Sequence, residues 1–206
     1  MPNIYNSDRS AFSEVINDLV QGAAKSNAWF ALAWAELQAR YGRTFIGVAW
    51  NMISFASFCL VITFLFGALA SEGRGSFGPH VVIGYLIYTF MSTVINESCL
   101  TFISNDSWIK GARLPLGVFI YKTVAKSTIL FLYNCVAAIA VLVFMYQVGF
   151  RIEYLSIIPA IILFLGSGVG AAMLLGVVCA RYRDIAHLMQ TVMRFALFVT
   201  PIMWQT

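Results

Sequence analysis

Long apolar segments alternate with short polar ones along this chain, and this pattern predicts membrane-spanning helices. Five stretches are almost free of charge: residues 44–70, 77–103, 124–148, 155–180 and 186–206. Each is long enough to cross about 30 Å of hydrocarbon as a helix. We therefore expect an all-α integral membrane protein whose single transmembrane domain contains five spans.

Residues 28–43 show a helical period instead of an unbroken apolar run. Glu36, Arg40 and Arg43 recur at i, i+4 and i+7 and form a polar face, with aromatic and apolar residues on the complementary positions. Such an amphipathic helix directly before a span is expected to lie in the membrane interface; a plain cytosolic helix is the alternative. Glu36 precedes Arg40 in the order that favours an ion pair within the helix.

The polar segments outside these elements differ in what they predict. Residues 1–27 are weakly patterned, and we expect a cytoplasmic N-terminal segment there. In the connection 104–126, Ser104, Asn105 and Asp106 are good helix N-caps, and Pro115 would stop a helix. A short helix of about 106–113 is expected in this connection, with an ordinary polar turn as the alternative.

Composition identifies the bilayer as the solvent. Of the 206 residues, 60% are hydrophobic and only 11% are charged, whereas a soluble domain has roughly 25% charged residues. The net charge of +4 therefore does not indicate a nucleic-acid partner, but its distribution predicts orientation. With a cytoplasmic N-terminus, only Arg74 and Arg151 of the interspan basic residues lie outside. The cytoplasmic set is Arg9, Lys25, Arg40, Arg43, Lys110, Arg113, Lys122, Lys126, Arg181 and Arg183.

The sequence lacks the common catalytic and metal-binding patterns. It has no phosphate-binding Gly-x-x-x-x-Gly-Lys loop, no Ser/His/Asp set, and four cysteines without metal spacing. We expect no enzyme activity, cofactor or metal in this chain.

Few ionisable residues fall inside the spans. Glu97 and Arg194 are the two we identify there, and they serve either substrate passage or structure, as an intramembrane pair or as snorkelled ends. Tyr85 and Tyr88 either line a channel, where rings can stack on sugar faces, or face lipid.

The segment before the last apolar run concentrates charge in four residues. Arg181, Arg183 and Asp184 are predicted to form a tight cytoplasmic turn, Arg181–Asp184, and Asp184 is expected to cap the next helix. Thr200-Pro201 is expected toward the outer side, where a helix can end or bend.

Three segments resemble one family of membrane proteins. They are WAELQARYGRTFIGVAWNMISF, NDSWIKGARLPLGVFIYKTVAKS and, most specifically, ARYRDIAHLMQTVMRFALFVTPIMW. Over residues 28–206 the chain is similar to the permease subunit of ABC exporters of the second type, in particular the exporters of O-antigen, capsular polysaccharide and teichoic acid.

The resemblance implies a function and partners. The family's permease has six spans and works as a homodimer with two separate ATPase subunits, which bind ATP and Mg. It moves an undecaprenyl-diphosphate-linked glycan to the outer side of the bacterial inner membrane. The sixth span and the external gate are expected beyond the five spans seen here.

The resemblance also assigns roles to residues. The family's interface or gate helix corresponds to Trp29–Arg43, and its coupling helix, which receives the ATPase motion, to about 105–114. The interface-helix and lipid-diphosphate candidates are Trp29, Trp34, Glu36, Arg40, Tyr41 and Arg43. The coupling candidates are Asn105, Asp106, Trp108, Ile109, Lys110, Arg113 and Leu114, and the channel candidates are Tyr85, Tyr88, Glu97 and Arg194.

Two other functions fit the same sequence. One is an ABC-2 exporter of drugs or lipids, since short outer loops do not exclude it. The other is a membrane enzyme or scaffold for lipid-linked sugars that does not transport; it would need polar catalytic residues clustered at one membrane face, and the sequence does not show such a cluster.

Overall fold

The computed structural model describes residues 4–42, 45–69, 74–111, 114–147, 157–200 and 202, and all regular structure within these ranges is helical. The expected all-α class is therefore confirmed. The helices are α1 (Ile4–Ala24), α2 (Ser26–Tyr41), α3 (Ala49–Leu69), α4 (Arg74–Leu100), α5 (Asp106–Gly111), α6 (Leu116–Tyr146), α7 (Ile157–Arg181) and α8 (Arg183–Val199).

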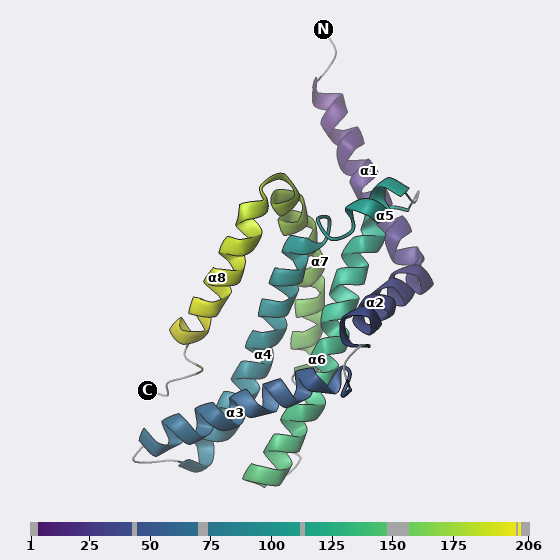
Figure 1. Ribbon diagram of the computed structural model, residues 1–206. Helices are drawn as coiled ribbons and strands as arrows, with labels where there is room; N and C mark the ends of the chain where they lie inside the picture. Colours follow the sequence, from purple (N-terminus) through teal and green to yellow (C-terminus); the bar gives the residue numbers. More distant parts are fainter. Residues whose placement is uncertain are drawn as a thin grey trace.

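The centre of the bundle is formed by α4, α6 and α7 (Figure 1). α4 packs against both α6 and α7, α8 packs on α4, and α3 contacts α4 and α6. α3 runs obliquely across the other helices in this view, and the Asn51 amide donates to Asn134 Oδ1 of α6 at 2.7 Å. α5 and the α7–α8 turn lie at the same end of the bundle, with α1 beyond them (Figure 1).

Three of the expected spans have the length and hydropathy needed to cross a membrane. They are Gly78–Leu100 in α4, Leu116–Tyr146 in α6 and Leu163–Arg181 in α7. In α3, which has 21 residues, the apolar segment identified is Ala49–Leu65. α8 has 17 residues and an amphipathic pattern, and the rest of the expected span 186–206 lies largely outside the described residues.

The start of α6 differs most from the prediction. The third span was expected from residue 124, but α6 begins at Leu116, directly after Pro115. Lys122 and Lys126, which were placed in a polar connection, are therefore within the helix and buried. The boundary was wrong because these charges have partners on other helices, as described below.

The first span also begins later than expected. α2 ends at Tyr41 and α3 starts at Ala49, not at residue 44. Gly47 between them has φ +63°, a left-handed conformation that glycine adopts without strain. This turn separates the predicted interface helix from the first apolar helix.

The N-terminal segment is a helix packed on the beginning of α6. Asp18 Oδ2 of α1 accepts a hydrogen bond from the Gly117 N–H at 2.8 Å, so it satisfies a free donor in the first turn of α6. The two backbones are very close, since a Cβ at Gly22 would stand 2.6 Å from the Gly117 carbonyl carbon. Weak patterning in residues 1–27 had not predicted α1.

Candidate functional site

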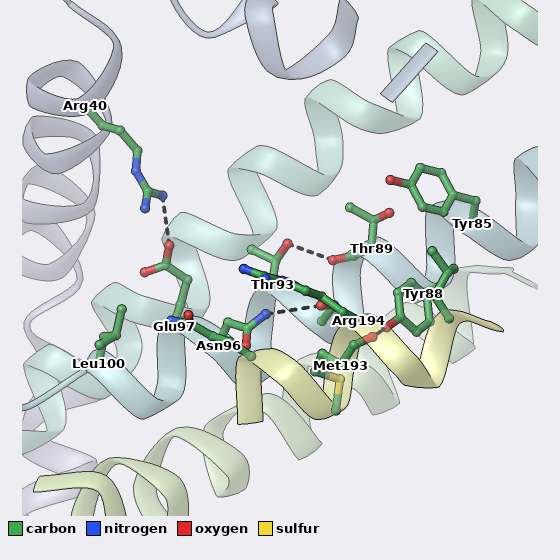
Figure 2. A pocket seen from close by; sticks show the side chains of 13 residues that line it. Arg40, Tyr85, Tyr88, Thr89, Thr93, Asn96, Glu97, Leu100, Met193 and Arg194 are labelled. Carbon is green, nitrogen blue, oxygen red and sulfur yellow. Dashed lines mark hydrogen bonds and ion pairs between the residues drawn. The ribbon is translucent and has the colours of Figure 1, made fainter. Parts of the chain in front are cut away.

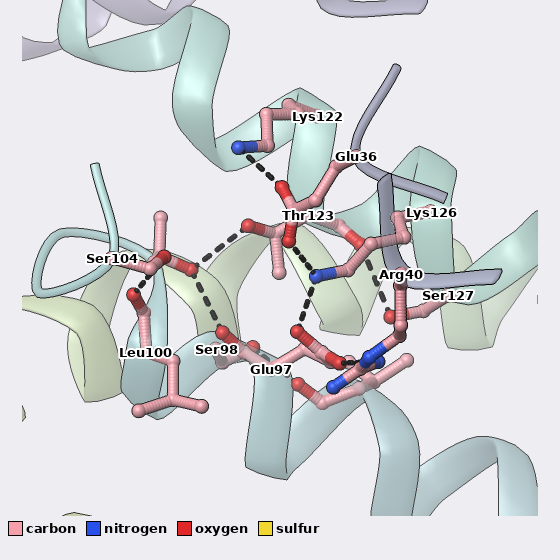
Figure 3. Close-up of polar contacts among 12 residues, drawn as sticks. Glu36, Arg40, Glu97, Ser98, Leu100, Ser104, Lys122, Thr123, Lys126 and Ser127 are labelled. Atoms are coloured by element: carbon pink, nitrogen blue, oxygen red, sulfur yellow. Dashed lines mark hydrogen bonds and ion pairs between the residues drawn. The ribbon is translucent and has the colours of Figure 1, made fainter. Parts of the chain in front are cut away.

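Five charged side chains from three helices meet near the end of α4 and the start of α6 (Figure 3). We call them the charge cluster: Glu36 and Arg40 of α2, Glu97 of α4, and Lys122 and Lys126 of α6. Residues four apart on a helix share a face. The pair on α2 therefore shares one face, as does the pair on α6, and Glu36 lies against both lysines of α6 while Arg40 reaches α4.

The ion pairs run continuously from α6 through α2 to α4. Glu36 binds both lysines, with Oε2 2.5 Å from Lys122 Nζ and Oε1 2.5 Å from Lys126 Nζ. Lys126 also pairs with Glu97. Glu97 Oε1 in turn accepts from an Arg40 guanidinium nitrogen at 2.9 Å. Each carboxylate thus has two cationic partners, which offsets the cost of removing these charges from water.

Burial differs sharply within the charge cluster. The side chains of Lys126 and Glu97 are 5% and 12% exposed, whereas that of Arg40 is 53% exposed. Arg40 is therefore the member that solvent or a ligand can reach most easily.

The two α2 members are also shifted in acidity. Burial alone would raise the pKa of Glu36, but hydrogen bonds and charges from Lys122 and Lys126 outweigh it and hold the pKa below its usual value. Burial would lower the pKa of Arg40, and the Glu97 carboxylate reverses this and raises it. Both groups are therefore charged at neutral pH.

The charge cluster corrects three expectations. Glu36 and Arg40 do not pair with each other as their spacing predicted, because each has a partner on another helix. Glu97 pairs with Lys126 and Arg40 and not with Arg194, and Lys122 and Lys126, which were expected in a connection, are buried within α6. Lys122 and Lys126 are four residues apart, as are Glu36 and Arg40, and this helical spacing was the one signal in the sequence that could have indicated their place on a helix face.

A polar groove of about 380 Å³ lies next to the charge cluster, between α4 and α8 (Figure 2). It brings together all four channel candidates, Tyr85, Tyr88, Glu97 and Arg194, and adds Arg40 from α2. The remaining lining residues are Thr89, Ser92, Thr93, Asn96, Leu100, Gln190, Met193 and Leu197.

Two polar groups of this groove have spare capacity. Arg194 forms no ion pair with any described residue and extends from α8 toward α4 (Figure 2). Asn96 Oδ1 is buried and accepts no hydrogen bond within the described part of the chain, although its amide donates to Ser92 Oγ at 3.2 Å. Tyr88 is different, since its hydroxyl already donates to the Met193 carbonyl and fastens α4 to α8.

The interface-helix candidates divide into packed and exposed residues. The Trp29 ring lies 6.3 Å from the Tyr121 ring of α6 between centroids, which helps seat α2 on α6. Trp34 is exposed, and Tyr41 is half-buried in the last turn of α2. Arg43 lies outside the described residues.

The connection between α4 and α6 contains the expected short helix. α5 spans Asp106–Gly111, with Trp108 exposed, Ile109 half-buried, and Lys110 paired with Asp106 at 2.6 Å. Residues 112–113 of the predicted helix, Arg113 among them, lie outside the described residues, and Leu114 is half-buried.

Asn105 does not cap α5 with its side chain. It is buried, donates to the Thr101 carbonyl at 2.6 Å, and accepts from Lys122 Nζ at 2.6 Å. This bond connects the start of α5 to the charge cluster.

The predicted turn after the fourth span is tight. Arg181 ends α7, Arg183 begins α8, and Tyr182 between them is the one non-helical residue of the turn. Asp184 was expected to cap α8, but the cap position is occupied by Tyr182, with no side-chain hydrogen bond. Asp184 instead lies in the first turn, where its charge is favourable to the helix dipole.

Comparisons with known proteins agree with this picture of a helical membrane domain. A comparison with curated proteins found no match. A scan against protein families matches residues 27–206 to the family described as ABC-2 type transporter. The match includes α2 to α8 and begins after α1. Because it covers most of the chain, the protein belongs to the ABC-2 type transporter family, as a membrane permease subunit of an ATP-driven exporter that works with ABC ATPase partners.

Proposed function

We propose that this permease moves a lipid-linked polysaccharide, of the O-antigen, capsular or teichoic acid kind, across a bacterial inner membrane. In this proposal the chain has a cytoplasmic N-terminus and forms a homodimer with two ATPase subunits, which bind ATP and Mg. The lipid carrier is undecaprenyl diphosphate, and the glycan passes from the cytoplasmic to the outer side.

The observation that carries the proposal is the chemistry of the polar groove. Arg40 and Arg194 provide two guanidinium groups against the single carboxylate of Glu97, so the groove attracts an anion. Guanidinium groups bind phosphate oxygens through paired donors. A diphosphate head group matches this charge.

The remaining lining suits a sugar. The free acceptor of Asn96 can receive a hydrogen bond from a hydroxyl group, and Gln190, Ser92 and Thr93 offer further polar contacts. The rings of Tyr85 and Tyr88 supply apolar faces. The volume of about 380 Å³ falls in the range of small-molecule sites. We therefore propose that the groove holds the head group and the first sugar, not the polymer.

The same proposal gives roles to α5 and α2. When the ATPase subunits close, their motion reaches the permease through Trp108 and its neighbours on α5. Asn105 carries it to Lys122 of the charge cluster, and Glu36 carries it on to α2. α2 then moves relative to α4, which changes the groove.

Transport in proteoliposomes tests this function. The chain is reconstituted with its ATPase partner and a fluorescently labelled undecaprenyl-diphosphate-linked glycan, and glycosidase access from the outside is followed after ATP addition. We expect ATP-dependent access in wild type and at least a tenfold lower rate for Arg194→Ala at equal protein level, since a charged contact contributes 1.5–3 kcal/mol, roughly.

Three outcomes would contradict the proposal. Export of a small drug or a phospholipid with no glycan movement would favour the alternative ABC-2 exporter. Turnover of the lipid-linked sugar without any ATPase would favour a membrane enzyme or scaffold. Equal loss of protein level and transport in Arg194→Ala would assign that residue to folding.

A further inference from the structure

The polar groove and the charge cluster share two residues. Arg40 and Glu97 line the groove, and their ion pair is also the last step of the chain that runs from α6 through α2 to α4. A ligand that binds a charge in the groove therefore acts directly on the attachment of α2.

The charge balance leaves room for an anion. The charge cluster contains three cations, Arg40, Lys122 and Lys126, and two carboxylates, Glu36 and Glu97, so it carries one excess positive charge. Arg194 adds a second on the opposite wall of the groove, with no ion-pair partner in the described ranges. An anion between Arg40 and Arg194 would neutralise both.

Arg40 can leave its partner at low cost. Glu97 is held twice, and if Arg40 moves away the buried Lys126 still pairs with the same carboxylate. The buried charge of Glu97 is then not left uncompensated, which is the situation that costs most. Lys126 itself is fixed between Glu36 and Glu97, so the exposed Arg40 is the partner that is exchanged.

We infer that a phosphate-bearing head group binds between Arg40 and Arg194, takes Arg40 from Glu97, and so frees the C-terminal part of α2 from α4. This inference rests on the proposed function for its ligand, but its geometry depends only on the charge cluster and the groove. The Glu36 ion pairs keep the middle of α2 on α6, and α3 begins only at Ala49, after a turn in which Gly47 has a positive φ. Residues 37–42 are therefore the part that moves when the groove is occupied.

Amide hydrogen exchange on the full chain in phosphatidylcholine nanodiscs tests the inference. Undecaprenyl diphosphate and phosphatidylglycerol are added separately, because both present phosphate to the same guanidinium groups. We expect undecaprenyl diphosphate to raise exchange in residues 37–42 by about threefold or more, with no change in residues 26–33. An equal response to phosphatidylglycerol would also support the inferred change of ion-pair partner by Arg40, and it would identify an ordinary membrane lipid as the ligand.

Variants separate binding from release. Arg194→Gln should weaken binding of undecaprenyl diphosphate by about tenfold, the value of one lost charged contact at an open site. Arg40→Gln should show the raised exchange in 37–42 without ligand, and ligand should add nothing. Glu97→Gln removes the carboxylate of the same ion pair, so it should also raise amide exchange in residues 37–42 without ligand. Lys25→Gln, which removes an exposed positive charge outside the groove, should behave as wild type.

The failures are distinguishable. Binding of undecaprenyl diphosphate with unchanged exchange in 37–42 would overturn the inference and leave the proposed function intact. Arg40→Gln with wild-type exchange would overturn it as well. Release of α2 by phosphatidylglycerol in a protein that exports no glycan would support the inference and refute the proposed function.

Discussion

Lys126 holds the charge cluster together, and its replacement by methionine is the sharpest test of that role. Methionine keeps the volume and the apolar stem of lysine but removes the ammonium group, which binds Glu36 and Glu97 at once. Both carboxylates would keep one cation, Lys122 and Arg40 respectively. The loss is therefore smaller than for a buried charge left without any partner.

The magnitude follows from burial. Removing one partner of a buried pair costs about 3–5 kcal/mol, and Glu36 is screened by its 34% exposure. We expect Lys126→Met to lower the free energy of unfolding by about 2–3 kcal/mol, at or just below the lower limit of that range, because both carboxylates keep one cation. For a chain of this length, each kcal/mol corresponds to about 2–4 °C of melting temperature, so the melting temperature should fall by about 4–12 °C.

The assay is thermal unfolding of the purified protein in detergent, followed by the monodisperse fraction after heating. Lys110→Met is the matched control, because Lys110 pairs with Asp106 at 2.6 Å but is 74% exposed. Exposed pairs contribute about 0–1 kcal/mol, so its shift should stay within about 2 °C.

A double variant completes the cycle. Lys126→Met with Glu97→Gln removes the charge that Lys126 compensated, so it should recover about 1 kcal/mol of the loss and show non-additivity. If Lys126→Met unfolded within about 2 °C of Lys110→Met, the buried ion pairs would contribute nothing specific and the reasoning would be refuted.

Three other predictions concern α1, acidity and α5. Asp18→Ala should cost about 1 kcal/mol, as for a lost helix cap, and speed amide exchange in α1 and the first turn of α6; unchanged protection would contradict the Asp18–Gly117 hydrogen bond. Because the lysines hold the pKa of Glu36 below its ordinary value, the stabilising contribution of this carboxylate is complete at neutral pH and is lost as pH falls through the lowered pKa. Glu36→Gln should remove this loss of stability at acid pH from a melting series, and an identical series would refute it. Trp108→Ala should reduce ATP-driven export about tenfold while the melting temperature stays within about 2 °C, and full export would count against a docking role for α5.

The apolar pattern predicted the fold class and the approximate position of most helices, because hydropathy and length are properties of one segment at a time. It misplaced the start of α6 because the charges of Lys122 and Lys126 were taken as a sign of water. The partners of Lys126 are 90 and 29 residues away in sequence, at Glu36 and Glu97, and Lys122 also pairs with Glu36. Compensation of a charge by a distant helix is not visible in a local pattern.

The candidate site was predicted in part for a similar reason. Tyr85, Tyr88, Glu97 and Arg194 were identified one by one as polar or aromatic residues within spans, and they meet in one groove. The contribution of Arg40 to that groove depends on how α2 lies across α6, which spacing along α2 does not specify. α1 was missed because its seat on Gly117 is a tertiary contact.

The order of the charges along the chain has a consequence for biosynthesis. A ribosome completes Glu36 and Glu97 before it reaches Lys122 and Lys126, and the N-terminal part of a chain is available to fold first. The carboxylates of Glu36 and Glu97 can thus already be in place when α6 is inserted. The two lysines of α6 then need not enter hydrocarbon unpaired. A rearranged gene that placed α6 ahead of α2 and α4 would encode the same contacts, but the lysines would be made before the carboxylates. We expect α6 to insert poorly in the protein made from such a gene.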